Sequence, residues 1–418
     1  MIKGNSHRHL LTLLGYIWAG TILGQPKVPG LPITYHYAAE TYGAGTQNWA
    51  ILQEPGGLLY AANHFGLLTY DGDRWELHQQ QASASLKSLA SGSDGQLFAG
   101  GQGKFGYFMP NTQGLLQFHS LHQDIPAPYR NFDEVWHIYA TDKGTYFTTH
   151  SYIFKLTDDS LSVISHPTEI SYAFYLRNRL YVSGREEGLL VEEEGTLIQV
   201  PGGAILAHQN IRSMLEVGPN DVLIATHKGH LFRMQHNEIR RWYASVDNLL
   251  QASLINCAIQ LRDGRLVIGT QNQGLYILNP DGVLQMHLDR GKGLHSHSVL
   301  GLFEGDYGTL WAATANGISQ VELGAPFTLL NEQTGLKGAG YAATIWNGKL
   351  ILGTTNGAFF QSATGFVPVS GSSGQVWSFS HQQGALLMGH HEGAFVYRNG
   401  TFQSFSGQKG AWNFLPRK

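Results

Sequence analysis

Short runs of alternating large and small apolar residues recur along the chain after residue 30. Each run follows a turn, and nine copies can be aligned: "GLLYAAN", "GQLFAGG", "GTYFTTH", "NRLYVSG", "NDVLIAT", "GRLVIGT", "GTLWAAT", "GKLILGT" and "GALLMGH". Self-similarity at a regular spacing indicates a repeat architecture. The copies follow one another at intervals of 34 to 49 residues, which is typical of one four-stranded β-propeller blade with variable loops.

The pattern inside each copy favours strands over helices, because alternation with a period of two places successive side chains on opposite faces of a sheet. The fourth position is always large and apolar: Tyr60, Phe98, Phe147, Tyr181, Leu223, Val267, Trp311, Ile351 and Leu387. The sixth is always small: Ala62, Gly100, Thr149, Ser183, Ala225, Gly269, Ala313, Gly353 and Gly389. Small side chains permit a close approach where neighbouring sheets converge on a central channel. An apolar strand precedes each copy and one or two strands follow it, so each unit predicts a four-stranded blade.

The order of the strands predicts how the ring closes. The segment "ITYHY", from residue 33 to 37, precedes the first unit and has no blade of its own. We expect it to supply the fourth strand of blade seven, which would close a seven-bladed ring over residues 32–323 and remove the exposed edges. The predicted fold class is therefore all-β, with one closed seven-bladed β-propeller.

A second, incomplete propeller is predicted over residues 326–418. The segment "PFTLL" at Pro326 is placed like "ITYHY", and two full units follow it. The last residues, "GAWNFLPRK", resemble the first strand of a third unit that is interrupted. Because a few blades cannot close a ring, we expect this chain to be a fragment or a truncated product of a longer protein.

The first residues differ in kind from the repeats. Lys3 and Arg8 precede an apolar run from Leu10 to Gly24, and a polar, turn-forming stretch follows. This order is typical of a secretory signal peptide, predicted over residues 1–25, with an uncleaved membrane anchor as the alternative. The expected location of the rest of the chain is the periplasm.

Composition and charge exclude some functions. The net charge of −3, with 27 Lys and Arg against 30 Asp and Glu, leaves no strongly basic face for nucleic acid. The single cysteine, Cys257, lies in the apolar run "LINCAIQL" and is expected to be a small buried side chain. We expect no cofactor, and contact with a membrane only through an uncleaved signal peptide.

The blade sequences resemble a known family. The stretch "TYGAGTQNWAILQEPGGLLYAANHFGLLTYDGDRWELH" is similar to the first blade of the periplasmic sensor region of two-component regulator propeller proteins, especially those that also carry a triple-tyrosine domain. "DGRLVIGTQNQGLYIL" and "GDYGTLWAATANGISQVEL" follow the same pattern. The resemblance implies two seven-bladed propellers, a triple-tyrosine domain, a membrane helix and a histidine kinase or helix-turn-helix output module. It also implies a homodimer in the full-length form.

The sequence gives little support for catalytic or metal-binding residues. The turn "EGDYGTLW" resembles the Asp-box of sialidases, which is structural. Asp133 and Glu134 are adjacent, so on a strand they would point to opposite faces, whereas glycoside hydrolysis needs two carboxylates that converge. The pair His295 and His297 would share a face of a strand, and "GHHEG" places two histidines beside Glu392. A metal site needs several converging donors, so we expect neither a metal nor catalysis.

Binding has more support in the sequence. Loops that follow the second strand of a blade and those that lead into the first strand are expected to gather on one face around the channel. Polar and aromatic residues at these positions are the candidate ligand-binding residues: Asn48, Trp49, Asn63, His64, Asn131, Asp133, Glu134, Trp136, Arg185, Glu186, His227, Gln271 and Asn272. Such a set is typical of a site for a small molecule or an oligosaccharide.

The favoured hypothesis is a non-catalytic periplasmic sensor. The alternatives are a secreted propeller enzyme that acts on glycans, a hydrolase or a lyase, and a scaffold for protein interactions.

Overall fold

The structure is a computed structural model that describes residues 30–79, 85–93, 95–158, 160–236, 238–363, 365–406 and 408–415. The predicted signal peptide lies outside the described residues. The chain divides into two compact units, one formed by Leu31–Leu329 and the other containing Leu330–Lys418. In the part of the chain that is described, no helix combines the length and the apolar character needed to cross a lipid bilayer.

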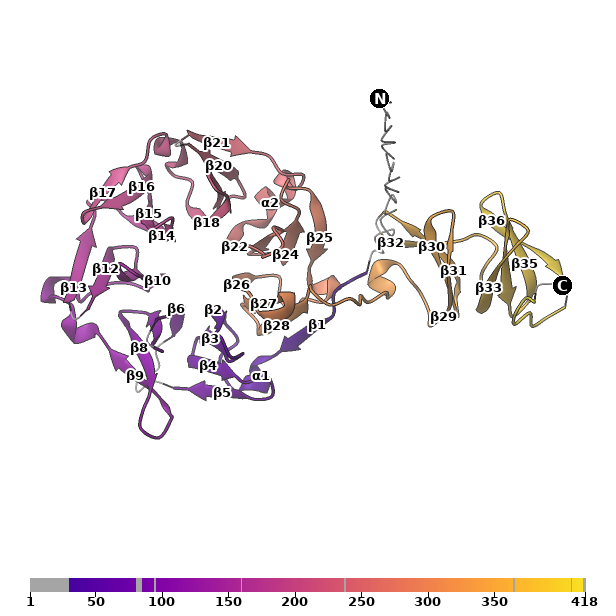
Figure 1. Cartoon of the computed structure of the whole chain (residues 1–418), viewed down its shortest axis with the longest axis horizontal. Helices are drawn as coiled ribbons and strands as arrows, with labels where there is room; N and C mark the ends of the chain where they lie inside the picture. Colours follow the sequence, from indigo (N-terminus) through magenta and orange to yellow (C-terminus); the bar gives the residue numbers. More distant parts are fainter. Residues whose placement is uncertain are drawn as a thin grey trace, which may run out of the picture. The chain divides into compact units, whose positions relative to one another are not determined.

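The first unit is built from four-stranded antiparallel sheets, in which consecutive strands are neighbours. Figure 1 shows these sheets arranged in a ring with their first strands innermost. In chain order the first four sheets are β2 (Asn48–Gln53), β3 (Leu59–Asn63), β4 (Gly66–Tyr70) and β5 (Trp75–His78); β6 (Leu86–Ser91), β7 (Leu97–Gly101), β8 (Lys104–Pro110) and β9 (Leu116–Ser120); β10 (His137–Thr141), β11 (Gly144–Thr148), β12 (Tyr152–Thr157) and β13 (Ser160–Ser165); and β14 (Ile170–Leu176), β15 (Arg179–Gly184), β16 (Gly188–Glu193) and β17 (Thr196–Gln199).

Three more sheets complete the first unit. They are β18 (Ile211–Gly218), β19 (Asp221–Thr226), β20 (Leu231–Gln235) and β21 (Glu238–Trp242); β22 (Ile255–Gln260), β23 (Leu266–Thr270), β24 (Leu275–Leu278) and β25 (Leu284–Leu288); and β26 (Val299–Glu304), β27 (Thr309–Thr314) and β28 (Ile318–Glu322) with β1 (Thr34–Tyr37). Short helices α1 (Ala39–Tyr42) and α2 (Asp247–Ser253) lie in connections, together with the 3-10 turns His122–Asp124, Ala127–Tyr129, Gly203–Leu206, Arg290–Lys292 and Asp306–Gly308.

The predicted closing strand is present. Strand β1 pairs antiparallel with β28, from Thr34 opposite Val321 to Tyr37 opposite Ile318. The Tyr37 hydroxyl donates a hydrogen bond of 2.7 Å to Gln320 Oε1. Its ring lies 5.3 Å from the ring of Trp75, in the following sheet. The first and last sheets of the unit are thus joined by backbone pairing and by aromatic packing.

The core lies in layers between neighbouring sheets rather than at one centre. One layer packs Phe98 and Phe105 against Phe147 and Phe154 of the next sheet. The large fourth position of the repeat is buried in the first eight copies. At the sixth position, a Cβ atom added to Gly100 would lie 2.6 Å from Val135 Cγ1, and one added to Gly353 would lie 2.5 Å from Val376 Cγ1. Small residues are therefore required there because the next sheet begins against them.

The second unit contains two four-stranded sheets among its described residues. They are β29 (Gly340–Trp346), β30 (Lys349–Thr354), β31 (Gly357–Ser362) and β32 (Gly365–Pro368), then β33 (Val376–Gln382), β34 (Ala385–His390), β35 (Gly393–Arg398) and β36 (Thr401–Ser406), with a 3-10 turn at Glu332–Thr334. The segment "PFTLL" forms only an isolated bridge, from Leu329 to Leu31.

The predicted strand at Gly410 to Leu415 is not formed as a strand. Its backbone nevertheless begins like a first strand: Gly410 N donates to His391 O at 2.8 Å, as Ile255 N donates to His227 O at 2.9 Å.

Candidate functional site

A β-bulge recurs near the start of the first strand of the sheets. In β2, Asn48 is opposite Asn63 but Ala50 is opposite Ala62, so Trp49 is an extra residue in the pairing. The bulge residues in the first unit are Trp49, Lys87, Arg212, Asn256 and Leu300, with one extra residue at Ser171 or Tyr172 in β14. Trp136 directly precedes His137, the first paired residue of β10. A bulge re-aims side chains and is common beside functional sites.

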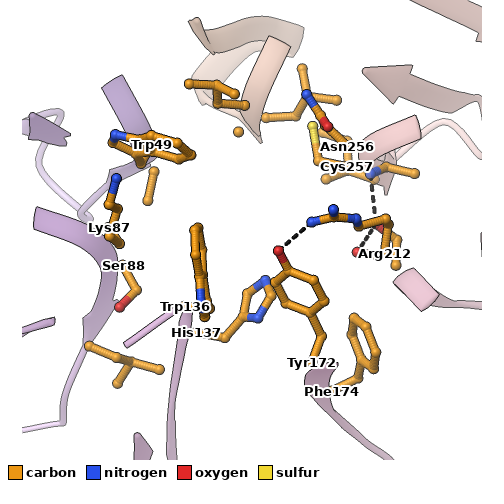
Figure 2. A pocket seen from close by; sticks show the side chains of 18 of the residues that line it. Trp49, Lys87, Ser88, Trp136, His137, Tyr172, Phe174, Arg212, Asn256 and Cys257 are labelled. Atoms are coloured by element: carbon orange, nitrogen blue, oxygen red, sulfur yellow. Dashed lines mark hydrogen bonds between the residues drawn. The ribbon is translucent and has the colours of Figure 1, made fainter. Parts of the chain in front are cut away.

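These residues line a cavity at the centre of the first unit, called the channel cavity below. Its volume is about 430 Å³, and every first strand of the ring contributes to its wall. Figure 2 shows the side chains of Trp49, Lys87, Trp136, Tyr172 and Arg212 converging on one space. A cavity of this size that combines aromatic walls with a few polar groups is typical of small-ligand sites.

Aromatic and cationic groups are in direct contact in the channel cavity. Lys87 Nζ lies 3.4 Å from the centroid of the Trp49 ring and 5.7 Å from that of Trp136. The two indoles meet edge to face at 5.9 Å. On the other side, the Arg212 guanidinium lies 4.7 Å from the Tyr172 ring and donates a hydrogen bond to the Tyr172 hydroxyl. These contacts hold both cations against ring faces.

Burial changes the protonation equilibria of several groups in the cavity. Burial, then the charges of Arg212 and His150, lowers the pKa of His137 to about 4, so its imidazole is neutral at pH 7. Burial also lowers the pKa of Lys87, although the carboxylate of Glu134 opposes this shift. Burial raises the pKa of the Cys257 thiol to about 12. The thiol therefore stays protonated and unreactive in the folded protein.

Several polar atoms that line or adjoin this space are buried and unpaired among the described residues. They include the Nε1 atoms of Trp49 and Trp136, Nδ1 of His137 and Nε of Arg212. Buried donors without a partner are uncommon and each needs an explanation. Because these nitrogens expose almost no surface, a molecule in the channel cavity reaches them only if the side chains turn.

A second hollow adjoins the first and shares Tyr172 and Arg212 with it; it is called the neighbouring pocket below. Its volume is also about 430 Å³, and its wall includes Arg185, His227 and Lys228. Arg185 forms a 3.0 Å ion pair with Glu169 at an exposed position. His227 Nδ1 lies 3.0 Å from the carbonyl oxygen of Ile255, which fixes the direction of its ring.

The sequence-predicted residues fall into three groups. Trp49 and Trp136 line the channel cavity, and Arg185 and His227 line the neighbouring pocket. These four are brought together by the fold and remain candidates for ligand contact.

Asn48 and Asn63 form the second group, and the structure corrects their predicted role. Both are fully buried, at 0% exposure. Asn63 Nδ2 donates to Asn48 Oδ1 at 2.8 Å and to the carbonyl oxygen of Gly45 at 2.6 Å, and Asn63 Oδ1 accepts from Gly45 N at 3.0 Å. Because their hydrogen-bonding capacity is used inside the blade, we assign them to its stability.

The remaining predicted residues lie outside both hollows: His64, Asn131, Asp133, Glu134, Glu186, Gln271 and Asn272. Asp133 accepts a 3.1 Å hydrogen bond from His150 N, and Glu134 forms an isolated bridge with Gln102. The expectation that Asp133 and Glu134 would lie on a strand is wrong, because β10 begins only at His137.

The histidine pair considered as a metal site is also not on a strand. His295 and His297 lie in the connection before β26. The His295 ring stacks on that of His36, with centroids 3.8 Å apart. Across the described residues, no group of three or more His, Cys, Asp or Glu side chains is arranged to hold a metal ion.

The sequence reasoning missed Lys87, His137, Tyr172 and Arg212. The predicted binding residues were expected in loops, whereas these four lie within or at the ends of the first strands. A usable signal exists in the aligned first strands, where one variable, often charged or aromatic residue directly follows the first apolar residue, as in "LKSLAS" and "IRSMLEV".

Comparisons with known proteins bear on the fold. No protein-family model matches the sequence, and no curated protein is a significant match. Among solved structures, the extracellular domain of the hybrid two-component system BT3049 of B. thetaiotaomicron is 19% identical over 89% of this chain and 54% of that domain, with a TM-score of 0.63. That of BT4673, from the same organism, is 17% identical over 90% of this chain and 53% of that domain, with a TM-score of 0.56.

A propeller enzyme is also among the similar structures. Virginiamycin B lyase from Staphylococcus aureus is 14% identical over 71% of this chain and 99% of that enzyme, with a TM-score of 0.54. The chain spans about half the length of the two sensor domains. The all-β propeller fold predicted from the repeats is confirmed, and the resemblance to two-component sensor propellers seen in the blade sequences is matched by the fold of two extracellular sensor domains.

Proposed function

We propose that this chain is the ligand-binding propeller region of a two-component-type sensor, and that its ligand binds in the channel cavity without being converted. The observation that supports this most is the repeated bulge, which aims one side chain from successive first strands into one cavity. In this proposal residues 32–323 form the binding domain and residues 326–418 begin a second propeller.

Thermal unfolding of the full chain against a panel of oligosaccharides and cell-wall fragments tests the binding site. A ligand that binds only the folded state raises the melting temperature. We expect one member of the panel to do so for the natural protein and for the matched control His64→Ala, which changes an exposed histidine outside both hollows. We expect the rise to be lost in Trp136→Ala. An undiminished rise in Trp136→Ala would place the site elsewhere.

Catalysis is the second candidate, because the structurally similar virginiamycin B lyase shows that an enzyme can use this fold. The observation that favours it is His137, a neutral imidazole in the channel cavity, since a neutral imidazole can accept a proton. Chromatography of the same samples separates the two candidates. Unchanged ligand after prolonged incubation is expected for a sensor, whereas a product that disappears in His137→Gln would establish an enzyme.

Export to the periplasm is part of the proposal, because the similar sensor structures are extracellular domains. The test is expression of the full chain in a Gram-negative host, followed by cell fractionation and mass spectrometry. We expect a periplasmic protein whose N-terminus lies near residue 25. A cytoplasmic protein that retains Met1 would contradict it.

A further inference from the structure

The wall of the channel cavity carries positive charge and no carboxylate, and the carboxylate of Glu134 acts on Lys87 from outside this wall. Lys87 and Arg212 lie in its wall, and none of the described residues lining it is Asp or Glu. Within the described part of the chain, neither cation forms an ion pair with a carboxylate. A charge withdrawn from water is costly unless it is paired. Contact with ring faces offsets only part of this cost.

The field of Arg212 reaches several neighbouring groups. Its charge contributes to lowering the pKa of His137 and that of His227, and it opposes the rise in the pKa of Tyr172 that burial causes. Each of these effects has the sign expected of a positive potential. The potential thus extends from the channel cavity to the wall of the neighbouring pocket, where Lys228 adds a further cation and Arg185 is paired with Glu169.

The two cations of the channel cavity are separated by aromatic side chains. Lys87 Nζ is 5.7 Å from the Trp136 ring, the Trp136 and Tyr172 rings are 5.9 Å apart, and the Arg212 guanidinium is 4.7 Å from the Tyr172 ring. Figure 2 shows Lys87 and Arg212 on opposite sides of the space, with Trp136 between them. Two cations with aromatic side chains between them are complementary to a molecule that has a negatively charged group at each end and a flat or ring-shaped body between these groups.

We propose that the channel cavity selects a small organic dianion, with one negatively charged group near Lys87, the other near Arg212, and a ring-shaped body against Trp136 and Tyr172. The cavity volume of about 430 Å³ admits a molecule of this size. Arg212 would pair with a carboxylate through the N–H donors of its guanidinium group. This inference rests on the proposed function, because it names the ligand class of the same site.

Two pairs of probes distinguish whether the dianion is an acidic saccharide or an aromatic dicarboxylate. Digalacturonate is a saccharide with two carboxylates, and terephthalate is an aromatic dicarboxylate; the dimethyl ester of each keeps the ring body without the charges. Titration calorimetry with the full chain measures all four. We expect at least one acid to bind at least tenfold more tightly than its ester. Equal affinity of acids and esters, or binding by none of the four probes, would overturn the inference.

Variants locate the charge dependence. Lys87→Met and Arg212→Lys are each expected to weaken the acid that binds by at least fivefold, while Arg74→Met, at an 86% exposed side chain, leaves it unchanged. Arg212→Lys is used instead of Arg212→Met because it keeps the positive charge and the fold. It removes only the pair of parallel N–H donors of the guanidinium group. An unchanged affinity in Lys87→Met would overturn the inference.

A measurement without any ligand separates failure of this inference from failure of the proposed function. Iodide, an anion, and acrylamide, a neutral molecule, both quench indole fluorescence. The fluorescence of Trp49 and Trp136 is obtained as the difference between the natural protein and the double variant Trp49→Phe/Trp136→Phe. We expect iodide, relative to neutral acrylamide, to quench this part at least twofold less in Lys87→Met. No change would refute the positive potential. If an uncharged panel member alone raises the melting temperature, the sensor proposal stands and the dianion is wrong.

Discussion

Replacement of Asn63 by alanine tests whether this residue holds the blade together or faces a ligand. Its amide nitrogen donates to Gly45 O, Asn48 Oδ1 and Gln47 O. Its amide oxygen accepts from Gly45 N and from Phe65 N at 2.9 Å. Phe65 is exposed, so water can replace the bond to its N–H. Gln47 is also exposed, and Gly45 O keeps a 3.1 Å hydrogen bond from the Tyr42 hydroxyl. The remaining two partners, Gly45 N and Asn48 Oδ1, lie in buried residues and would be left unsatisfied.

The expected cost follows from those two groups. A buried donor or acceptor left without a partner costs about 1 to 3 kcal/mol, and water entering the vacated space limits the loss to the lower part of that range. We therefore expect Asn63→Ala to lower the free energy of unfolding of the first unit by about 2 to 3 kcal/mol. The matched control is Asn131→Ala, which removes an exposed amide of the same size and is expected to change it by less than about 0.5 kcal/mol.

Urea unfolding of the full chain, followed by amide hydrogen exchange, measures the effect in each unit separately. Protection in β3 and β4 should fall in Asn63→Ala, whereas protection in β30 and β34, which belong to the second unit, serves as an internal reference. The reasoning is refuted if Asn63→Ala shifts the unfolding midpoint no more than Asn131→Ala, because the amide would then be free to contact a ligand, as the sequence first suggested.

Three further outcomes are expected. As pH falls from about 6.5 towards 4, the unfolded chain takes up a proton that the buried His137 does not, so stability is lost over this range; the urea midpoint should fall less steeply in His137→Gln, and parallel profiles would contradict this. Cys257 is half-buried and lines the channel cavity, but its pKa is raised to about 12, so its thiol should react with a disulfide reagent at pH 8 at least 100-fold more slowly than a free thiol. The normal rate should return only in denaturant, and fast labelling of the native chain would refute the raised pKa. Gly100→Ala should cost about 2 kcal/mol because its Cβ would meet Val135, while Gly218→Ala, which meets only Asp221 at 3.4 Å, should change stability by less than about 0.5 kcal/mol; equal losses would count against sheet contact as the cause.

The fold could be predicted because each blade repeats its physical constraints. A large residue such as Phe98 must fill the layer between two sheets, and a small one such as Gly100 must admit the next sheet. Strand β1 could be assigned to the last sheet because "ITYHY" had no partner before it in the chain. The segment "PFTLL" copied this pattern, but its pairing extends only to the bridge at Leu329, so similar sequence did not ensure a strand.

The site was less predictable because the bulge changes the face of a strand without changing its composition. In "LKSLAS" and "IRSMLEV", strict alternation would send Lys87 and Arg212 away from their apolar neighbours, whereas one extra residue in the pairing turns them into the cavity. For Asn63 the failure has another cause. An asparagine after a strand can face a ligand or bond to its own backbone turn, and only the position of Gly45 and Asn48 decides between them.

The pairing of β1 with β28, called the seam below, affects how the first unit folds during synthesis in the cell. The bond from Tyr37 to Gln320 joins residues separated by 283 positions. At a synthesis rate of roughly 5 to 20 residues per second, the N-terminal strand waits about 15 to 60 s before its partner strand leaves the ribosome. Contacts of such long range also slow folding, because the chain must lose loop entropy before they form. We expect the seam to be the last part of the first unit to acquire protection from exchange during folding.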